Sequence, residues 1–295
     1  MIDRTYFQPA DLKGARSFLA KHPDARVVAG GTDLVVAARS GKNALPQSLV
    51  AIHSLKELTG IEEGRGGRLE IRALTTHGDL EGSELIRQSW TAISDAAALV
   101  GSPATRHLGT IGGNICNASP AMELGSPLLI FEAEVELVSR GRPRRVPFGS
   151  FVTGPGRTDA RPGELLATVR LPRLGARGLI GSAYLRLEYR QSMEIAIVGA
   201  AALVVLDRSG KCKQARIALT AVAPTCIRAR QAEDALRGLK LDDAALDRAA
   251  EAAAAAASPI DDVRAGADYR RAMVGVIARR ALLKAAERAR ERKGK

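Results

Sequence analysis

Two glycine-rich stretches decide how this chain folds: Ala29-Gly30-Gly31-Thr32-Asp33-Leu34 and Thr110-Ile111-Gly112-Gly113-Asn114-Ile115. Each stretch places two adjacent glycines beside a small hydroxyl residue, next to an apolar run that could form a strand. Because glycine has no Cβ atom, its backbone can turn sharply and bring successive N–H groups against an anion. Either stretch alone also fits an ordinary turn. Together they predict two loops that hold a diphosphate from both sides.

The composition narrows the class of protein. The 295 residues suffice for two or three domains with hydrophobic cores. No run approaches the roughly 20 apolar residues of a membrane span, and residues 1–6 lack the apolar core of a signal peptide, so we expect a cytoplasmic protein. Three scattered cysteines and four histidines without a metal-binding spacing predict no disulfide framework and no metal site. A redox function would therefore need an organic cofactor.

The net charge of +12 raises the question of nucleic-acid binding. Residues 279–295 hold eight Lys and Arg against two Glu, so the excess is concentrated at the C-terminal end. Aromatic residues make up only 3% of the chain, which leaves few side chains on which bases could stack. No helix-turn-helix, zinc-finger or RNA-recognition signature is present. A solvated tail or a docking surface for an acidic partner fits the charge better.

The first part of the chain reads as alternating short elements. A helix is expected over residues 11–20 with Asp11 as its cap, and strands over 26–29 and 48–52 flank a short helix over 33–38. This pattern predicts a compact βαβ-like unit. It is no dinucleotide-binding Rossmann unit, because the G-x-G-x-x-G pattern is absent.

From residue 58 onward the pattern becomes that of a largely antiparallel α+β region. Strands are expected over 69–73, 134–138 and 165–171, and a helix over 90–100. After a linker at 174–181 we expect two strands, over 195–206 and 215–222, and then helices over 246–257 and 269–290. The predicted division is lobe 1 at 1–57, lobe 2 at 58–174, a C-terminal domain at 181–290 and a basic tail at 291–295.

The continuation of the second stretch identifies a family. It runs on as Cys116-Asn117-Ala118-Ser119-Pro120-Ala121-Met122-Glu123, and residues 104–123 as a whole resemble the FAD-binding subunit of molybdenum-containing hydroxylases. That family includes the medium subunit of aerobic carbon monoxide dehydrogenase and the flavin domain of xanthine dehydrogenase. Further similarity lies, in the family's order, at residues 27–34, 151–158, 162–166, 216–225 and 257–265. The resemblance implies an α+β fold: a two-lobed FAD-binding domain of the vanillyl-alcohol-oxidase (PCMH) type, followed by a C-terminal α+β domain of the carbon monoxide dehydrogenase flavoprotein type.

The resemblance also implies which residues hold a non-covalent FAD. The expected FAD-binding residues are Ala29, Gly30, Gly31, Thr32, Asp33, Leu34, Thr110, Ile111, Gly112, Gly113, Asn114, Ser119, Glu123, Leu166 and Arg186. Glu123 would lie near the ribityl or ribose hydroxyls, with a surface Glu that begins the next helix as the alternative. Leu166 would pack on the flavin ring, and Arg186 would reach the ring unless it is a surface arginine. Asp33 would cap a helix or bond loop N–H groups, since a carboxylate repels a diphosphate.

One position departs from the family pattern. His107 stands where an Asn is frequent, so a polar bond made there by relatives is not expected here. Cys116 lies next to the second stretch, but no covalent flavin attachment is expected.

The implied role is electron transfer, without a catalytic side chain. In the family, a large molybdopterin subunit oxidises the substrate, and a small subunit with two 2Fe–2S clusters passes the electrons to FAD. FAD then reduces NAD⁺, a quinone, dioxygen or another acceptor, and we expect a dimer of heterotrimers. Two alternatives stay open: a self-sufficient flavin oxidoreductase acting on a small molecule, and a basic binding module without a cofactor.

Overall fold

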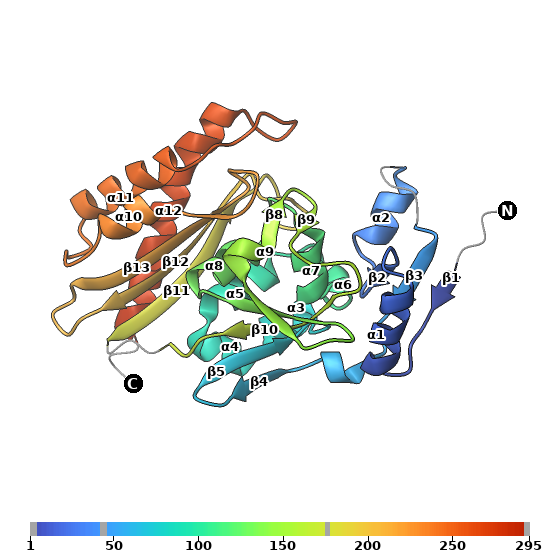
Figure 1. Cartoon of the computed structure of the whole chain (residues 1–295). Helices are drawn as coiled ribbons and strands as arrows, with labels where there is room; N and C mark the ends of the chain where they lie inside the picture. The colour runs from blue at the N-terminus through green and yellow to red at the C-terminus, as the bar shows by residue number, and fades with distance from the viewer. Residues whose placement is uncertain (1–4, 42–45, 175–177, 292–295) are drawn as a thin grey trace.

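A computed structural model describes residues 5–41, 46–174 and 178–291. Four sheets and the helices between them form three groups along the chain (Figure 1). This arrangement confirms the predicted α+β class. In the described ranges no helix is both long enough and apolar enough to cross a membrane.

Lobe 1 is built from a three-stranded parallel sheet and two helices. The strands β1 (Thr5–Phe7), β3 (Ser48–Ala51) and β2 (Arg26–Val28) lie in that order, and both pairings are parallel. Helices α1 (Leu12–Lys21) and α2 (Leu34–Arg39) complete the lobe, as the βαβ-like pattern predicted. The carboxylate of Asp11 accepts a hydrogen bond from the Gly14 N–H at 2.6 Å and begins α1, which confirms the predicted cap.

Lobe 2 contains a five-stranded antiparallel sheet. Its order is β4 (Ile61–Gly64), β5 (Arg68–Arg72), β10 (Leu165–Leu171), β6 (Glu134–Val138) and β7 (Arg144–Pro147). The bounds of β6 and β10 are those that the sequence predicted. The other elements are η1 (Lys56–Leu58), α3 (His77–Gly82), α4 (Glu84–Ser89), α5 (Thr91–Ala98), α6 (Pro103–Arg106), α7 (Ile111–Asn117), α8 (Gly125–Ile130), α9 (Phe148–Phe151), β8 (Val152–Gly154) and β9 (Arg157–Thr158).

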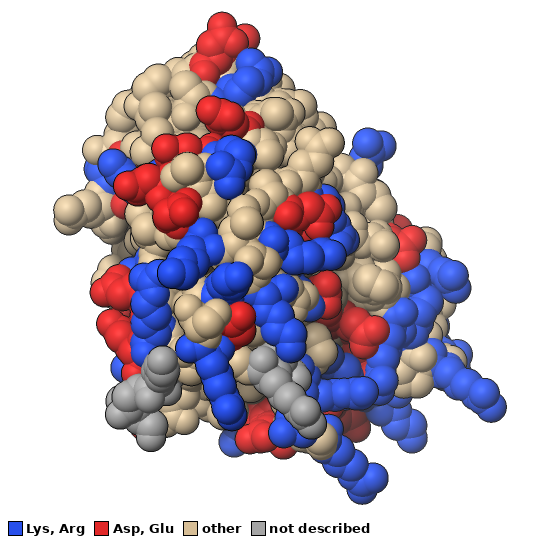
Figure 2. All heavy atoms as spheres, turned by 90° about the vertical axis from the view of Figure 1, so that its left-hand side faces the viewer, with Lys and Arg blue, Asp and Glu red and all other residues tan. Residues whose placement is uncertain are grey.

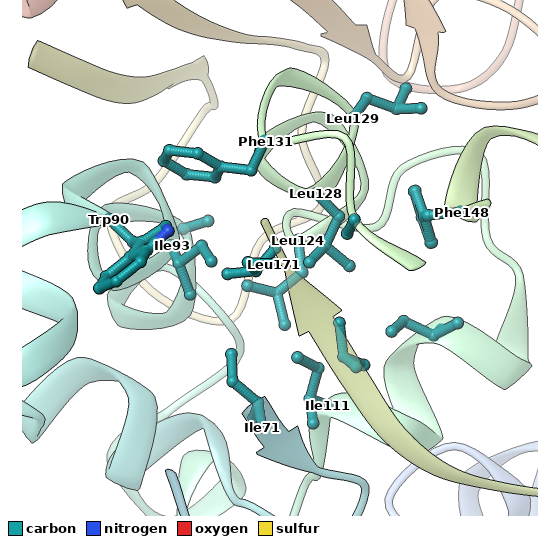
Figure 3. Close-up of a cluster of buried hydrophobic side chains, with 14 of the residues drawn as sticks. Ile71, Trp90, Ile93, Ile111, Leu124, Leu128, Leu129, Phe131, Phe148 and Leu171 are labelled. Carbon is teal, nitrogen blue, oxygen red and sulfur yellow. The ribbon is translucent and has the colours of Figure 1, made fainter. Parts of the chain in front are cut away.

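The helices of lobe 2 cover one face of its sheet and bury a hydrophobic core. Figure 3 shows Ile71 of β5 and Leu171 of β10 in one buried cluster with Ile93 of α5 and Leu128 of α8. This core continues into the C-terminal unit, where Tyr184 belongs to the same cluster. Lobe 2 and the C-terminal unit therefore share a buried interface, which fixes their relative positions.

The C-terminal unit is an antiparallel sheet covered by helices. The strand order is β11 (Leu179–Leu187), β12 (Val198–Leu206), β13 (Cys212–Thr220) and β14 (Ile227–Arg228). Helices α10 (Arg230–Asp234), α11 (Asp243–Ala255) and α12 (Ala267–Glu291) follow, and α12 runs along the sheet (Figure 1).

Strand β11 was not predicted from the sequence, and the strand expected over residues 195–206 begins three residues before β12 does. The reason is that Gly181, Ser182 and Arg186 interrupt the apolar alternation by which a strand is recognised. Gly181 is required for packing, because a Cβ atom there would lie 2.1 Å from the Ala285 carbonyl oxygen of α12. Residues 175–177 of the expected linker and 292–295 of the expected tail lie outside the described residues. The division into domains stays a prediction.

Candidate cofactor-binding site

The first glycine-rich stretch lies, backbone to backbone, against the two residues that precede the second stretch, Leu108 and Gly109. A Cβ atom on Gly30 would lie 1.8 Å from the carbonyl oxygen of Leu108 and 3.2 Å from the N–H nitrogen of Gly109. Gly31 next to it has a φ of +70°, a left-handed conformation that favours glycine. We call residues 29–34 the first loop and residues 107–114 the second loop. Only glycine at position 30 lets the two loops come this close.

The first loop presents a run of free backbone donors. Strand β2 ends at Val28, and α2 begins at Leu34. Among the described residues, no acceptor is found for the N–H groups of Gly30, Gly31, Thr32, Asp33 and Leu34. Successive unpaired N–H groups at a turn that opens a helix are the arrangement that proteins use to bind phosphate. The first loop therefore fits one side of a diphosphate.

In the second loop, unlike in the first, the backbone N–H groups of residues 111–114 already have acceptors within the chain. Its N–H groups donate within the chain: Ile111 to Thr75 O at 3.0 Å, Gly112 to Ala73 O at 2.9 Å, Gly113 to Thr110 Oγ1 at 3.1 Å and Asn114 to Thr110 O at 2.9 Å. Gly112 is needed because a Cβ atom there would lie 2.7 Å from the Ala73 carbonyl oxygen.

Two groups of the second loop are left for a ligand. The buried Oδ1 atom of Asn114 has no hydrogen-bond partner among the described residues. A Cβ atom on Gly113 would touch only the Thr110 hydroxyl, at 3.1 Å, so space is open beside that glycine. The second loop therefore offers a side-chain amide and room for close approach.

Asp33 does not cap α2 through its side chain. It occupies the position before the helix, but its backbone is helical, with φ −89° and ψ −45°, whereas a capping residue needs an extended backbone. Its Oδ1 atom instead accepts a hydrogen bond from Asn117 Nδ2 at 3.2 Å, at the end of α7. Partial burial raises the pKa of Asp33. The expected cap is thus replaced by a bond between the two lobes.

Glu123 and Arg186 form a buried ion pair. Arg186 Nη1 donates to Glu123 Oε1 at 2.5 Å, and the side chain of Arg186 is only 1% exposed. Glu188 pairs with the same guanidinium through Arg186 Nε, at 2.5 Å. Burial raises the pKa of Glu123 to about 7, although the Arg186 charge acts in the opposite direction. The two alternatives that the sequence left open, a surface Glu and a surface Arg, are wrong.

The other predicted residues are placed as follows. Leu166 is buried in the hydrophobic core of lobe 2, and its packing against a flavin stays a prediction. Ser119 Oγ accepts a hydrogen bond from the Ala121 N–H at 3.2 Å. The Nδ1 atom of His107 lies 2.7 Å from the Pro103 carbonyl oxygen within its own helical turn.

His77, which was not among the predicted site residues, lies against the second loop. Its N–H donates to the Gly109 carbonyl oxygen at 3.0 Å, and its ring carbon Cδ2 would lie 3.1 Å from a Cβ atom on Gly109. Burial and the nearby Arg106 lower the pKa of His77 to about 4, so the ring is neutral at neutral pH. Nothing near His77 in the sequence marked it as a site residue. Glu188 carried no such signal either, because it lies just after the end of β11 at Leu187, a strand that the sequence did not predict.

Comparison with known proteins matches two family models to this chain, one to its N-terminal part and one to its C-terminal part. Residues 2–174 match the family described as "FAD binding domain in molybdopterin dehydrogenase". Residues 183–285 match the family described as "CO dehydrogenase flavoprotein C-terminal domain".

Individual relatives match over nearly the full length. The xanthine dehydrogenase FAD-binding subunit of Escherichia coli O157:H7 is 31% identical over 281 residues, which are 95% of each chain. The carbon monoxide dehydrogenase medium chain of Afipia carboxidovorans is 34% identical over 285 residues, with 96% of this chain and 97% of that chain covered. A chain of quinoline 2-oxidoreductase from Pseudomonas putida 86 superposes with a TM-score of 0.90 at 29% identity, over 97% of this chain and 98% of that one. These matches confirm the predicted fold.

Proposed function

This chain belongs to the FAD-binding subunits of the molybdenum hydroxylases, and from that premise we propose that it passes electrons from 2Fe–2S clusters of a partner subunit to an external acceptor. Its cofactor is FAD, and it is a component of an oxidoreductase. When bound, FAD supplies the redox chemistry, and the task of this chain is to hold and tune it. The observation that carries the proposal is that the N–H groups of Gly30–Leu34 find no acceptor among the described residues, in a loop whose Gly30 lies against the Leu108 carbonyl.

The first loop would bind the diphosphate through its N–H groups, and the Thr32 hydroxyl could add a further bond. From the second loop, Asn114 would contribute its amide, and the missing Cβ of Gly113 would let a phosphate approach. Hydrogen bonds between a phosphate and several backbone amides are strong because the acceptor is charged. The two loops together would therefore fix the diphosphate between the lobes.

Glu123 and Arg186 would act on the rest of the cofactor. An ionised Glu123 accepts hydrogen bonds, so it suits the hydroxyls of the ribityl chain or the ribose. A cation such as Arg186 near the ring would stabilise negative charge on the reduced flavin and raise its potential. The ion pair between them, at 2.5 Å, holds both groups in place before the cofactor binds.

We propose that the chain works with a small 2Fe–2S subunit and a large molybdopterin subunit in a dimer of heterotrimers. The names of the relatives support this, because they describe a "medium chain" and an "FAD-binding subunit" of larger enzymes.

The test is to express the chain alone and together with the products of the adjacent reading frames. The proposal expects the isolated chain to bind FAD but to leave it oxidised when substrate is added without oxygen. In the complex, substrate should bleach the flavin absorbance after the clusters are reduced. Flavin reduction by substrate in the isolated chain would instead establish a self-sufficient oxidoreductase. A chain that never acquires a flavin spectrum would contradict the binding site itself.

A further inference from the structure

A groove of about 800 Å³ lies between α5, β11 and the second half of α12, away from the two glycine loops. Its floor is apolar, with Ala98 and Leu99 at the end of α5, Leu185 on β11 and Leu283 on α12. Arg280, Lys284, Arg288 and Arg290 of α12 line it as well. Figure 2 shows that Lys and Arg side chains gather over the lower half of the face on which the C-terminal unit lies. The groove thus combines an aliphatic floor with a basic wall.

Only part of the basic wall is neutralised within the chain. Arg288 pairs with Asp95 of α5 at 2.6 Å, and Lys284 pairs with Glu287 at 2.9 Å. Within the described ranges, Arg280 and Arg290 have no carboxylate within ion-pair distance. They are ten residues apart on one helix, which corresponds to about 15 Å along its axis. Two unpaired cations therefore stand at separate points along the groove.

The edge of β11 cannot pair with an added strand. The Ser182 carbonyl oxygen accepts hydrogen bonds from Thr91 Oγ1 at 2.6 Å and from Arg288 Nη1 at 2.8 Å. The Tyr184 N–H donates to Asp95 Oδ2 at 3.0 Å. Because these side chains already use the edge of β11, a segment in the groove must satisfy its own backbone. A helix does so, and an extended peptide does not.

We propose that this groove binds an acidic amphipathic helix of a partner chain. Apolar side chains of that helix would cover Leu185 and Leu283, and acidic side chains would meet Arg280 and Arg290. Charge complementarity supports this occupant, because the chain carries a net charge of +12 with eight Lys and Arg against two Glu in residues 279–295. A nucleic acid fits less well, because the aliphatic floor offers no exposed aromatic ring for a base, and Tyr184 is only 1% exposed.

The proposal goes beyond the FAD-binding role and holds whichever chain supplies the helix. A helix in this groove would contact α5 of lobe 2 and α12 of the C-terminal unit at once. It would therefore bridge the two units that carry Glu123 and Arg186, without touching either residue.

The test uses the full chain and a fluorescent peptide probe of about 18 residues, which spans roughly 27 Å as a helix. The peptide carries a stripe of Leu at helical spacing and Glu on its flanks, and binding is followed by fluorescence anisotropy. The double variant Arg280→Glu/Arg290→Glu should weaken binding about tenfold, and Leu283→Ser should weaken it as well. The matched control is Arg65→Glu/Arg142→Glu, which makes the same charge change at exposed positions of lobe 2 and should leave binding unchanged.

Three outcomes would overturn the proposal. Equal weakening by both double variants would show diffuse charge attraction without a site. Equal binding of a scrambled peptide of the same composition would show that the apolar floor plays no part. Binding of a single-stranded RNA or of phosphatidylserine vesicles in place of the peptide, lost only in the groove variants, would assign the surface to another class of partner. Flavin content is measured for every variant, because the proposal expects it to stay at the level of the unmodified chain.

Discussion

The backbone of Gly30 contacts the carbonyl group of Leu108, so closely that any side chain at position 30 would overlap the Leu108 oxygen. Gly30 comes from lobe 1 and Leu108 from lobe 2. The contact therefore sets the distance between the two loops that we propose to hold the FAD diphosphate. A glycine that at first suggested close approach to a ligand thus also serves close approach between two parts of the chain.

Gly30→Ala should push the loops apart. Because the added Cβ would meet backbone atoms that cannot rotate away, we expect the free energy of unfolding to fall by about 1–3 kcal/mol. FAD affinity should fall about tenfold or more, which is about 1.4 kcal/mol of binding energy. Titration calorimetry with FAD and denaturant unfolding check the two effects. The control is Gly82→Ala at the end of α3, where a Cβ would meet nothing within 4 Å. Equal FAD affinity in the Gly30 variant and the control would disprove the account of this contact.

Gly113→Val should remove FAD while keeping the fold. A Cβ atom at Gly113 would touch only the Thr110 hydroxyl, so α7 can tolerate a side chain there, but a branched one would fill the space proposed for a phosphate. The purified variant should lack flavin absorbance and keep the circular dichroism spectrum of the flavin-free chain. Gly113→Ala should lie between the two. Full flavin occupancy in the Val variant would mean that the phosphate lies elsewhere.

The buried carboxyl of Glu123 should make stability depend on pH. Its pKa in the folded chain is about 7, above the ordinary value of 4.5, so between these values the folded state binds a proton that the unfolded state has released. Stability from this group is full below pH 4.5 and is lost as pH rises through 7, by about 3 kcal/mol in total. Glu123→Gln cannot titrate and should not show this loss. Denaturant unfolding of the flavin-free chain across this pH range gives the difference between the two proteins, and parallel curves would refute the shift.

His77 should make the stability of the fold rise with pH, whereas Glu123 makes it fall. Its pKa is lowered from 6.5 to about 4, so between these two pH values His77 is protonated in the unfolded state and neutral in the folded state. Stability from neutral His77 is full above pH 6.5 and is lost as pH falls through 4, by about 3 kcal/mol. His77→Gln keeps a polar side chain of similar size and should remove this slope. Since Glu123 and His77 give slopes of opposite sign, only the difference between each variant and the unmodified chain isolates its group.

The local sequence predicted the strands whose apolar residues alternate regularly. It did not predict the elements whose residues are determined by packing against distant parts of the chain. Strands β6 and β10 alternate regularly, and the sequence predicted their bounds. Strand β11 carries Gly181 because α12 lies on top of it, which no local pattern can reveal. The short helices of lobe 2 likewise depend on the core that they share.

The same distinction holds for the site. The paired glycines marked both loops, but the way each loop uses its N–H groups depends on distant residues. The second loop is bonded to Ala73 and Thr75, about 40 residues earlier, whereas no residue in the described ranges accepts a hydrogen bond from the N–H groups of Gly30–Leu34. The burial of Arg186 between Glu123 and Glu188 joins residues more than 60 positions apart, and the sequence could only suggest that an arginine was near the flavin.

The free N–H groups of the first loop make the cofactor part of the folding equilibrium. In the proposed binding mode, the phosphate oxygens of FAD accept hydrogen bonds from the N–H groups of Gly30–Leu34, which find no acceptor among the described residues. Its contribution then follows mass action, growing as RT ln(1 + [FAD]/Kd) and reaching about 2.7 kcal/mol when FAD is a hundredfold above Kd. The amount of fully ordered subunit would therefore rise and fall with the supply of flavin, and the amides of Gly30–Leu34 would report it through their rate of hydrogen exchange.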